Sequence, residues 1–290
     1  SSDYFFFFHP FLWVFLPWTI LAIAAVGTRV KSFIKQKFVH RPNTEFLTTG
    51  GIVLIFALIS FAQFKLPHYL NVTIPLFSVL TASYMYRLYQ QSKDKAVKRF
   101  LVGQYVIAGI VFIASAGICY FVFKLSSVPV YIGLAAVVGI GMYFCVKGEG
   151  RFARLVTVSV CASLVLNMVL NFHFYPNLLT YQGGSAMAKV VKDQNISVDN
   201  IYKIGGEYTW SLDFYNQYPV QITSLEEVQN MHDVWVYASG KELEQLRNSG
   251  LDWDTQYSVD HFRITRLQAK FLNPNTRHQV LNKMYLLHVL

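Results

Sequence analysis

The chain has 290 residues, of which 53% are hydrophobic and 14% are charged, and its mean hydropathy is +0.34. The apolar residues stand in long blocks and do not alternate with polar ones, so the composition excludes an ordinary soluble globular protein. The net charge of +9 does not indicate nucleic-acid binding, because residues 1–180 hold 15 Lys and Arg against 4 acids, whereas residues 181–290 hold 10 against 12.

Six apolar segments have nearly the length of about 20 residues that a helix needs to cross a bilayer. They are residues 11–28, 47–64, 70–86, 100–123, 129–146 and 152–170. We therefore predict a membrane all-α bundle of about six transmembrane helices within residues 1–175. A small soluble α/β domain is predicted to follow over residues 181–290.

Basic residues follow the first, third and fifth segments, whereas the other two connections carry one cation each, Lys65 and Lys124. The basic residues are Arg29, Lys31, Lys35, Lys37 and Arg41, then Arg87, Lys93, Lys95, Lys98 and Arg99, then Lys147, Arg151 and Arg154. Loops rich in Lys and Arg stay on the cytoplasmic side. We expect a multi-pass protein of the inner (cytoplasmic) membrane, with Lys65, Lys124 and everything after residue 171 outside.

The N-terminal stretch YFFFFHP (residues 4–10) is crowded with aromatic rings, which favour the membrane interface. Its histidine, His9, either belongs to this aromatic anchor or faces an external substrate, and the anchor is the simpler interpretation. Pro17 lies in the first segment, where a proline bends a helix and leaves a backbone carbonyl for a neighbour to satisfy.

The second and third segments are joined by KLPHYL (residues 65–70). Proline disfavours helical backbone in the preceding residue and has no N–H of its own, so Leu66-Pro67 is a natural end for a span. KLPHYL is therefore predicted to be the turn of a transmembrane hairpin. It brings an ammonium, an imidazole and a phenol to the edge of two spans that contain no charged residue.

KLPHYL, followed by Pro75 and an apolar helix, resembles a motif of the polyprenyl-phosphate-dependent membrane glycosyltransferases. That family contains the aminoarabinose transferase of lipid A and relatives of the protein O-mannosyltransferases. His9-Pro10 with Leu16-Pro17-Trp18 resembles the family's approach to an earlier span, and YTWSLDFY (residues 208–215) resembles a short motif of its extracytoplasmic tail. Gln63-Phe64 departs from the small polar pair expected ahead of KLPHYL. The resemblance implies transfer of a sugar from a polyprenyl-phosphate donor to an envelope lipid, glycan or protein acceptor on the outer face of the membrane.

A lipid-linked donor presents its phosphate at the membrane interface. Lys65 offers a compact positive charge, and His68 and Tyr69 can add directional hydrogen bonds to phosphate oxygens. Together they would stabilise the charge that develops on the departing phosphate. Residue chemistry alone equally favours an interfacial anchor, in which Lys65 snorkels and Tyr69 joins an aromatic belt. The resemblance favours the phosphate site, and apart from the lipid-linked donor no cofactor is identifiable.

An inverting transfer also needs a base to accept a proton from the acceptor hydroxyl, commonly a carboxylate. The acids of the membrane half are Asp3, Glu45, Asp94 and Glu149. The last three fall on the cytoplasmic side in the predicted topology, and Asp3 at the terminus is given no catalytic role. The resemblance implies that the family carries its acid in an external loop between spans that would precede residue 1. The chain thus looks like the C-terminal portion of such an enzyme, without its catalytic carboxylate.

Other candidates are weaker. His173, just after the last segment, could line the same external cavity as His9, although an interfacial ring is the simpler account. The histidines of the tail lack metal-ligand spacing, and no metal site is predicted. Residues 208–215, with Asp213, are aromatic enough for a sugar platform, but packing inside a small domain is the preferred interpretation.

The tail shows alternating strand and helix signals. Residues 201–204, 220–222 and 233–238 are predicted strands, and Ser185 is predicted to cap a helix. Two S-x-x-E patterns, from Ser224 and from Ser239, have the spacing of capping boxes. A strand pair is predicted within residues 255–267 and an amphipathic stretch after Pro274.

Two other functions fit the same sequence. A flippase or transporter for a lipid-linked sugar would usually place ionisable residues inside its spans, and the six segments contain no Asp, Glu, Lys or Arg in their interiors. A membrane anchor for an external binding domain would make KLPHYL a simple interfacial turn.

Overall fold

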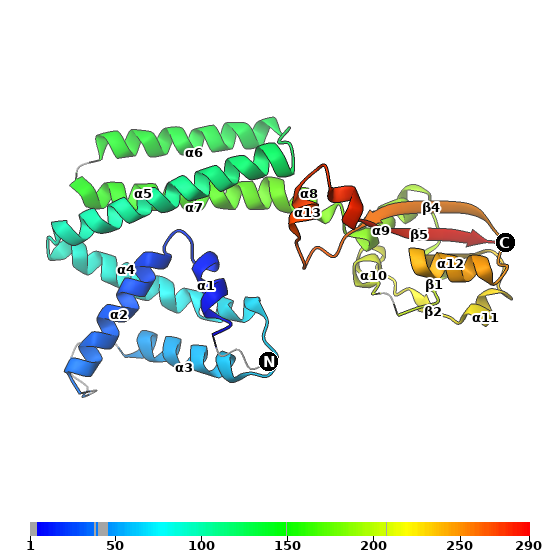
Figure 1. The fold of residues 1–290 in the computed structure, drawn as a ribbon, viewed down its shortest axis with the longest axis horizontal. Coiled ribbons are helices and arrows are strands. Elements are labelled where there is room, and N and C mark those ends of the chain that lie inside the picture. Colours follow the sequence, from blue (N-terminus) through cyan, green and yellow to red (C-terminus); the bar gives the residue numbers. More distant parts are fainter. Residues whose placement is uncertain (1–4, 38, 40–45, 149, 207) are drawn as a thin grey trace. The chain divides into compact units, whose positions relative to one another are not determined.

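The protein is represented by a computed structural model that describes residues 5–37, 39, 46–148, 150–206 and 208–290 (Figure 1). The chain divides into two compact units. We call Ser1–Ala116 with Ser127–Met168 the helical unit, and Gly117–Ser126 with Val169–Leu290 the α/β unit. The predictions for Asp3, Glu45 and Glu149 lie outside the described residues.

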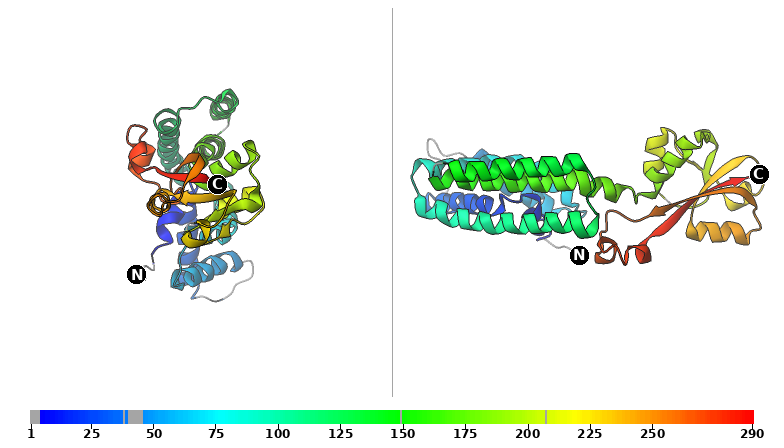
Figure 2. Two further views of the ribbon diagram at one scale, coloured as in Figure 1. Left: turned by 90° about the vertical axis from the view of Figure 1, so that its right-hand side faces the viewer. Right: turned by 90° about the horizontal axis from the view of Figure 1, so that it is seen from above.

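Apolar helices build the helical unit. Their bounds are α1 Phe8–Val14, α2 Thr19–Lys35, α3 Leu47–Phe61, α4 Ile74–Gln90, α5 Asp94–Gly117, α6 Val128–Lys147 and α7 Gly150–Val169. A 3₁₀ turn, η1 (Pro67–Val72), precedes α4. Helices α5, α6 and α7 lie side by side (Figures 1 and 2), and both α2 and α3 pack against α4.

Within the described residues, three helical stretches are long and apolar enough to cross a membrane. They are Asp94–Val122, Val128–Lys147 and Gly150–Leu179, with mean hydropathies of 2.2, 1.9 and 2.0. Helix α3 is apolar but shorter, with 15 residues. Helices α2 and α4 have 17 residues each. The fold is therefore mostly helical with three candidate membrane helices, together with a small mixed sheet.

The first predicted segment, residues 11–28, is wrong as a continuous helix. Helix α1 ends at Val14 and α2 begins at Thr19, because Pro17 has no N–H to donate and its ring blocks a helical hydrogen bond. As expected for such a break, a neighbour satisfies a backbone carbonyl: Gln104 of α5, which is 1% exposed, donates from Nε2 to the Pro17 oxygen at 3.0 Å. Helix α2 then continues to Lys35, so Arg29 and Lys31 lie within a helix and not in a loop.

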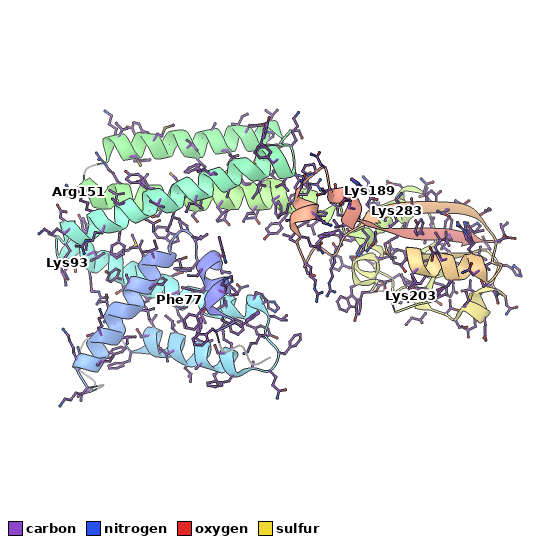
Figure 3. All side chains as sticks on the ribbon, viewed as in Figure 1. Phe77, Lys93, Arg151, Lys189, Lys203 and Lys283 are labelled. Atoms are coloured by element: carbon purple, nitrogen blue, oxygen red, sulfur yellow. The ribbon has the colours of Figure 1, made fainter. Side chains whose placement is uncertain are left out.

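Basic side chains gather at one end of the helical unit. Lys93 and Arg151 lie there in Figure 3, where α5 begins and α7 begins. The Arg151 guanidinium donates to Asp94 at 3.0 Å. The connection between α3 and α4, which contains KLPHYL, lies at the opposite end of these helices (Figure 1).

The α/β unit contains short helices and five strands. The helices are α8 Tyr175–Leu179, α9 Gly183–Asp193, α10 Trp210–Asn216, α11 Leu225–Val228, α12 Gly240–Asn248 and α13 Ala269–Leu272. The 3₁₀ and π turns are η2 Ile118–Val122, η3 Leu170–Phe174, η4 Val198–Asn200 and η5 Arg277–Val280. The strands are β1 Ile201–Lys203, β2 Gln221–Ile222, β3 Val234–Ser239, β4 Trp253–His261 and β5 Asn282–Val289.

The strands form one mixed sheet in the order β2-β1-β3-β5-β4. Strand β1 runs parallel to β2 and β3, whereas β5 runs antiparallel to β3 and β4. Side chains alternate along each strand, so each face of the sheet has its own core. Helices α9 and α10 cover one face, where Met187 and Leu212 meet Tyr237. Helix α12 covers the other, where Leu246 meets Val236.

Several local predictions for the tail are confirmed. Strands β1, β2 and β3 form at the predicted sites, and both capping boxes are present, at Ser224 with Glu227 and at Ser239 with Glu242. The Ser224 N–H and the Thr223 hydroxyl both donate to Glu227 and lower the pKa of its carboxyl group.

Other tail predictions are wrong. Residues 255–267 do not form a strand pair, because β4 is a single strand whose partner is β5, from the stretch after Pro274. Ser185 does not cap a helix: α9 begins at Gly183, and the Ser185 hydroxyl donates to the Gln182 oxygen at 2.9 Å.

Candidate functional site

The KLPHYL turn owes its shape to two prolines. Helix α3 stops at Phe61, and Leu66 is extended (φ −122°, ψ 137°), as the residue before a proline prefers to be. Pro67 opens the 3₁₀ turn η1, and the Thr73 hydroxyl donates to the Leu70 oxygen at 2.7 Å. Helix α4 then starts at Ile74 with Pro75 in its first turn, where a missing N–H costs no helical hydrogen bond.

A buried leucine fixes the turn to the helical unit. Leu70 is fully buried in a cluster that contains Phe7, Phe11 and Phe77, and the Tyr69 ring packs against this cluster. Because α1, α2, α3 and α4 all contribute to that cluster, the turn is held by tertiary packing and not only by its own hydrogen bonds. Full burial of a leucine side chain is worth about 1.5–3 kcal/mol.

Three functional groups are displayed on this anchored turn. His68 is exposed, while Lys65 and Tyr69 are half-buried. The rings of His68 and Tyr69 meet edge to face, with their centroids 4.9 Å apart and an angle of 82° between their planes. The turn therefore presents a cation and two hydrogen-bonding rings within five residues, a set suited to phosphate oxygens.

The two histidines predicted to line an external cavity occupy different units. His9 lies on α1 of the helical unit and is exposed. His173 lies in η3 of the α/β unit and is 3% exposed, with its Nε2 2.7 Å from the Phe123 oxygen and its Nδ1 3.4 Å from Asn177 Nδ2. This bond ties η3 to the connection between α5 and α6. A cavity-lining role for either residue stays a prediction.

A polar cluster in the sheet was not expected from the sequence. His288 of β5 lies between two carboxylates, with Nδ1 2.8 Å from Asp254 and Nε2 3.0 Å from Asp233. Burial lowers the pKa of His288, but the two carboxylates outweigh it and raise the pKa overall, while His288 lowers the pKa of Asp254. Strand pairing brings these three residues together, and their spacing along the chain gives no signal that could have predicted the cluster. No cluster of His, Cys, Asp and Glu residues in the described part of the chain, this one included, has an arrangement that could hold a metal ion.

The preference for aromatic packing at residues 208–215 is wrong. Tyr208, Trp210, Phe214 and Tyr215 are 62% to 75% exposed. The residue that helix α10 buries in the core is Leu212. Asp213 has a structural role, because it accepts from the Thr209 hydroxyl and from the Val220 N–H, both at 2.9 Å. A seven-residue helix has one buried stripe, and the aromatic residues lie off it.

Comparison with solved structures identifies the fold. The chain is similar to ArnT, the aminoarabinose transferase of Cupriavidus metallidurans and a polyprenyl-phosphate-dependent glycosyltransferase, in two crystal structures. The apo structure aligns with a TM-score of 0.55 and 14% identity, and the structure bound to undecaprenyl phosphate aligns with 0.56 and 13%. Each alignment covers 98% of this chain and 52% of ArnT, so the chain spans about half of the neighbour's length.

Searches at the sequence level find less. No protein-family model matches the chain, and no curated protein matches it. The likeness to ArnT is therefore one of fold and not of sequence, and this fold matches the one that the resemblance of KLPHYL implied.

Proposed function

We propose that this chain is the C-terminal portion of a polyprenyl-phosphate-dependent glycosyltransferase with six spans in the inner membrane. Residues 1–175 form the membrane region, and residues 181–290 form an extracytoplasmic domain. The observation that carries the proposal is the KLPHYL turn, anchored by Leu70 at the end of the helical unit opposite its basic connections. Support also comes from the fold neighbour, ArnT, one of whose structures is bound to undecaprenyl phosphate.

In this proposal, KLPHYL holds the phosphate of the donor. Lys65 supplies the positive charge, and His68 and Tyr69 each supply a hydrogen bond to a phosphate oxygen. Holding the phosphate also stabilises the charge left on it when the sugar departs. His9, which is exposed on α1, lines the external cavity in which the acceptor meets the donor. The acceptor is an envelope lipid, glycan or protein.

The donor site can be tested with this chain alone. Purified in detergent, it should bind undecaprenyl phosphate in preference to undecaprenol, which lacks the phosphate. Lys65→Ala should abolish that preference, whereas Lys124→Ala removes the same charge from the other sparsely charged connection and should leave it intact. His68→Ala and Tyr69→Phe should each weaken binding by about tenfold to a hundredfold, the equivalent of about 1–3 kcal/mol per hydrogen bond. Equal binding of both lipids by the unchanged chain would contradict the proposal.

Transfer separates this function from its alternatives. In the complete protein, Lys65→Ala should abolish sugar transfer while expression and membrane insertion stay normal, because an interfacial lysine contributes little to folding. A flippase would bind the lipid phosphate and transfer no sugar to any acceptor. If Lys65→Ala binds and transfers normally, the turn is an interfacial anchor and the phosphate role of all three residues is wrong.

A further inference from the structure

Two arginines at the basic end of the helical unit have buried nitrogen atoms without hydrogen-bond partners. They are Arg29 of α2, at Nε, and Arg87 of α4, at Nε and Nη2. Both side chains are half-buried. Buried polar atoms are nearly always hydrogen-bonded, and a buried charged donor without an acceptor is costly.

The helix repeat places the two arginines on the faces through which α2 and α4 pack. Helices α2 and α4 pack together, with Ala22 and Leu80 in one buried cluster. Arg29 follows Ala22 by seven residues, and Arg87 follows Leu80 by seven. Seven residues are two helical turns, so each arginine lies on the same helix face as the residue in that cluster. The charges of the two guanidinium groups are near enough to repel each other.

The neighbourhood offers no compensating carboxylate within the described residues. The acid that the structure describes in the helical unit is Asp94, and its carboxylate accepts from Arg151. Beside Arg87, the buried cluster to which Leu88 and Tyr84 belong consists of aromatic and aliphatic side chains and offers no second charge. Two like charges close together beside apolar side chains repel each other, and an anion bound between them would remove this repulsion.

We propose that Arg29 and Arg87 form a binding site for a phosphate group, supplied by an anionic phospholipid headgroup at the basic end of the helical unit or by free phosphate. A planar guanidinium donates two parallel hydrogen bonds to phosphate oxygens, so a single phosphate can satisfy the unpaired nitrogen atoms of both residues. The site is separate from KLPHYL, which lies at the other end of the same helices (Figure 1).

The test uses the full chain, purified and stripped of lipid. Phosphatidylglycerol should raise the thermal midpoint and remain bound in native mass spectrometry, whereas diacylglycerol, which lacks phosphate, should do neither. Arg29→Gln and Arg87→Gln should each weaken retention about tenfold or more, because each removes charged hydrogen bonds. Lys31→Gln removes the same charge from an exposed side chain of α2 and should retain the lipid.

Further measurements distinguish a lipid headgroup from free phosphate and show which results would contradict the proposal. A midpoint raised by inorganic phosphate as strongly as by phosphatidylglycerol would identify the ligand as free phosphate. If neither compound acts, or if Lys31→Gln loses the lipid as fully as the arginine variants, general surface charge explains the result and the site is wrong. Should the glutamine variants misfold, Arg87→Lys keeps the charge but loses the planar donor pair, so it should fold and still release the lipid.

Discussion

Arg277 should be the side chain whose loss most loosens the junction between η2 and the C-terminal part of the α/β unit. Its guanidinium donates to the Val122 oxygen at 2.6 Å, to the Phe271 oxygen at 2.9 Å and to the Tyr181 hydroxyl at 3.3 Å. It also lies 4.5 Å from the centre of the Phe123 ring and 5.2 Å from that of Phe271. One side chain therefore links segments more than 150 residues apart in the sequence.

The cost of Arg277→Ala follows from these contacts. A hydrogen bond from a charged donor contributes about 1.5–3 kcal/mol, and a partly desolvated cation–π contact contributes about 0.5–2 kcal/mol. The contacts share one side chain and are not additive, so we expect a net loss of about 3–4 kcal/mol in the free energy of local unfolding. Arg277→Lys keeps the charge but cannot reach three acceptors at once, so it should recover only part of this loss.

Hydrogen exchange in the full chain measures this effect directly. A loss of about 3 kcal/mol corresponds to exchange about a hundredfold faster for amides of residues 117–126 and 269–281. Arg263→Ala removes the same charge from an exposed side chain and should leave these rates unchanged. Unchanged protection in Arg277→Ala would refute the assignment of Arg277 as a tie and would mean that aromatic packing alone holds the junction.

Two further predictions concern the sheet and the helix pair α6 and α7. The pKa of His288 is raised above 6.5 in the folded state, so the stability that it contributes with its two carboxylates is complete below about pH 6.5 and is lost as the pH rises through the folded pKa. Between pH 6 and pH 8 the thermal midpoint should therefore fall less in His288→Asn than in the unchanged chain. The control His278→Asn, at an exposed histidine, should behave like the unchanged chain. Equal pH dependence in all three proteins would contradict the role of His288. Gly141→Ala places a methyl group against the Cys161 sulfur of α7 and should lower the thermal midpoint in detergent. Gly139→Ala, whose new carbon has nothing within 4 Å, should leave the midpoint unchanged. Equal midpoints for the two variants would show that α6 and α7 can separate freely.

Local chemistry predicted the parts of the fold that are made locally. Each capping box needs only a serine and a glutamate three residues apart, and both form because the geometry lies within one helical turn. Strand β3, bounded by Asp233 and Gly240, begins with four β-branched and aromatic residues, 234–237, and it forms where predicted. KLPHYL likewise forms a turn, because proline restricts its own backbone and that of the residue before it.

Pairings between distant segments escaped prediction. The partner of β4 begins more than 20 residues further along the chain, and alternation in the sequence does not reveal which strand will lie beside which. The cluster around His288 depends on the same pairing. Residues 208–215 show a second reason why sequence-based prediction fails. Their composition shows that aromatic rings are present, but only the orientation of α10 decides that Leu212 is buried and Trp210 is exposed.

Helix α4 connects the two proposed phosphate sites, and its length allows both to be correct. From Ile74 to Arg87 the helix spans about 20 Å, and the six residues of η1 add at most about 12 Å. The distance from Lys65 to Arg87 is therefore of the order of the bilayer core of about 30 Å together with part of the headgroup layers. A span with a phosphate-binding cation at each end would lie in the membrane with Lys65 at one headgroup layer and Arg87 at the other. In the proposed six-span topology, a 17-residue helix would then suffice as a span, because its flanking cations, and not additional apolar residues, would meet the two interfaces.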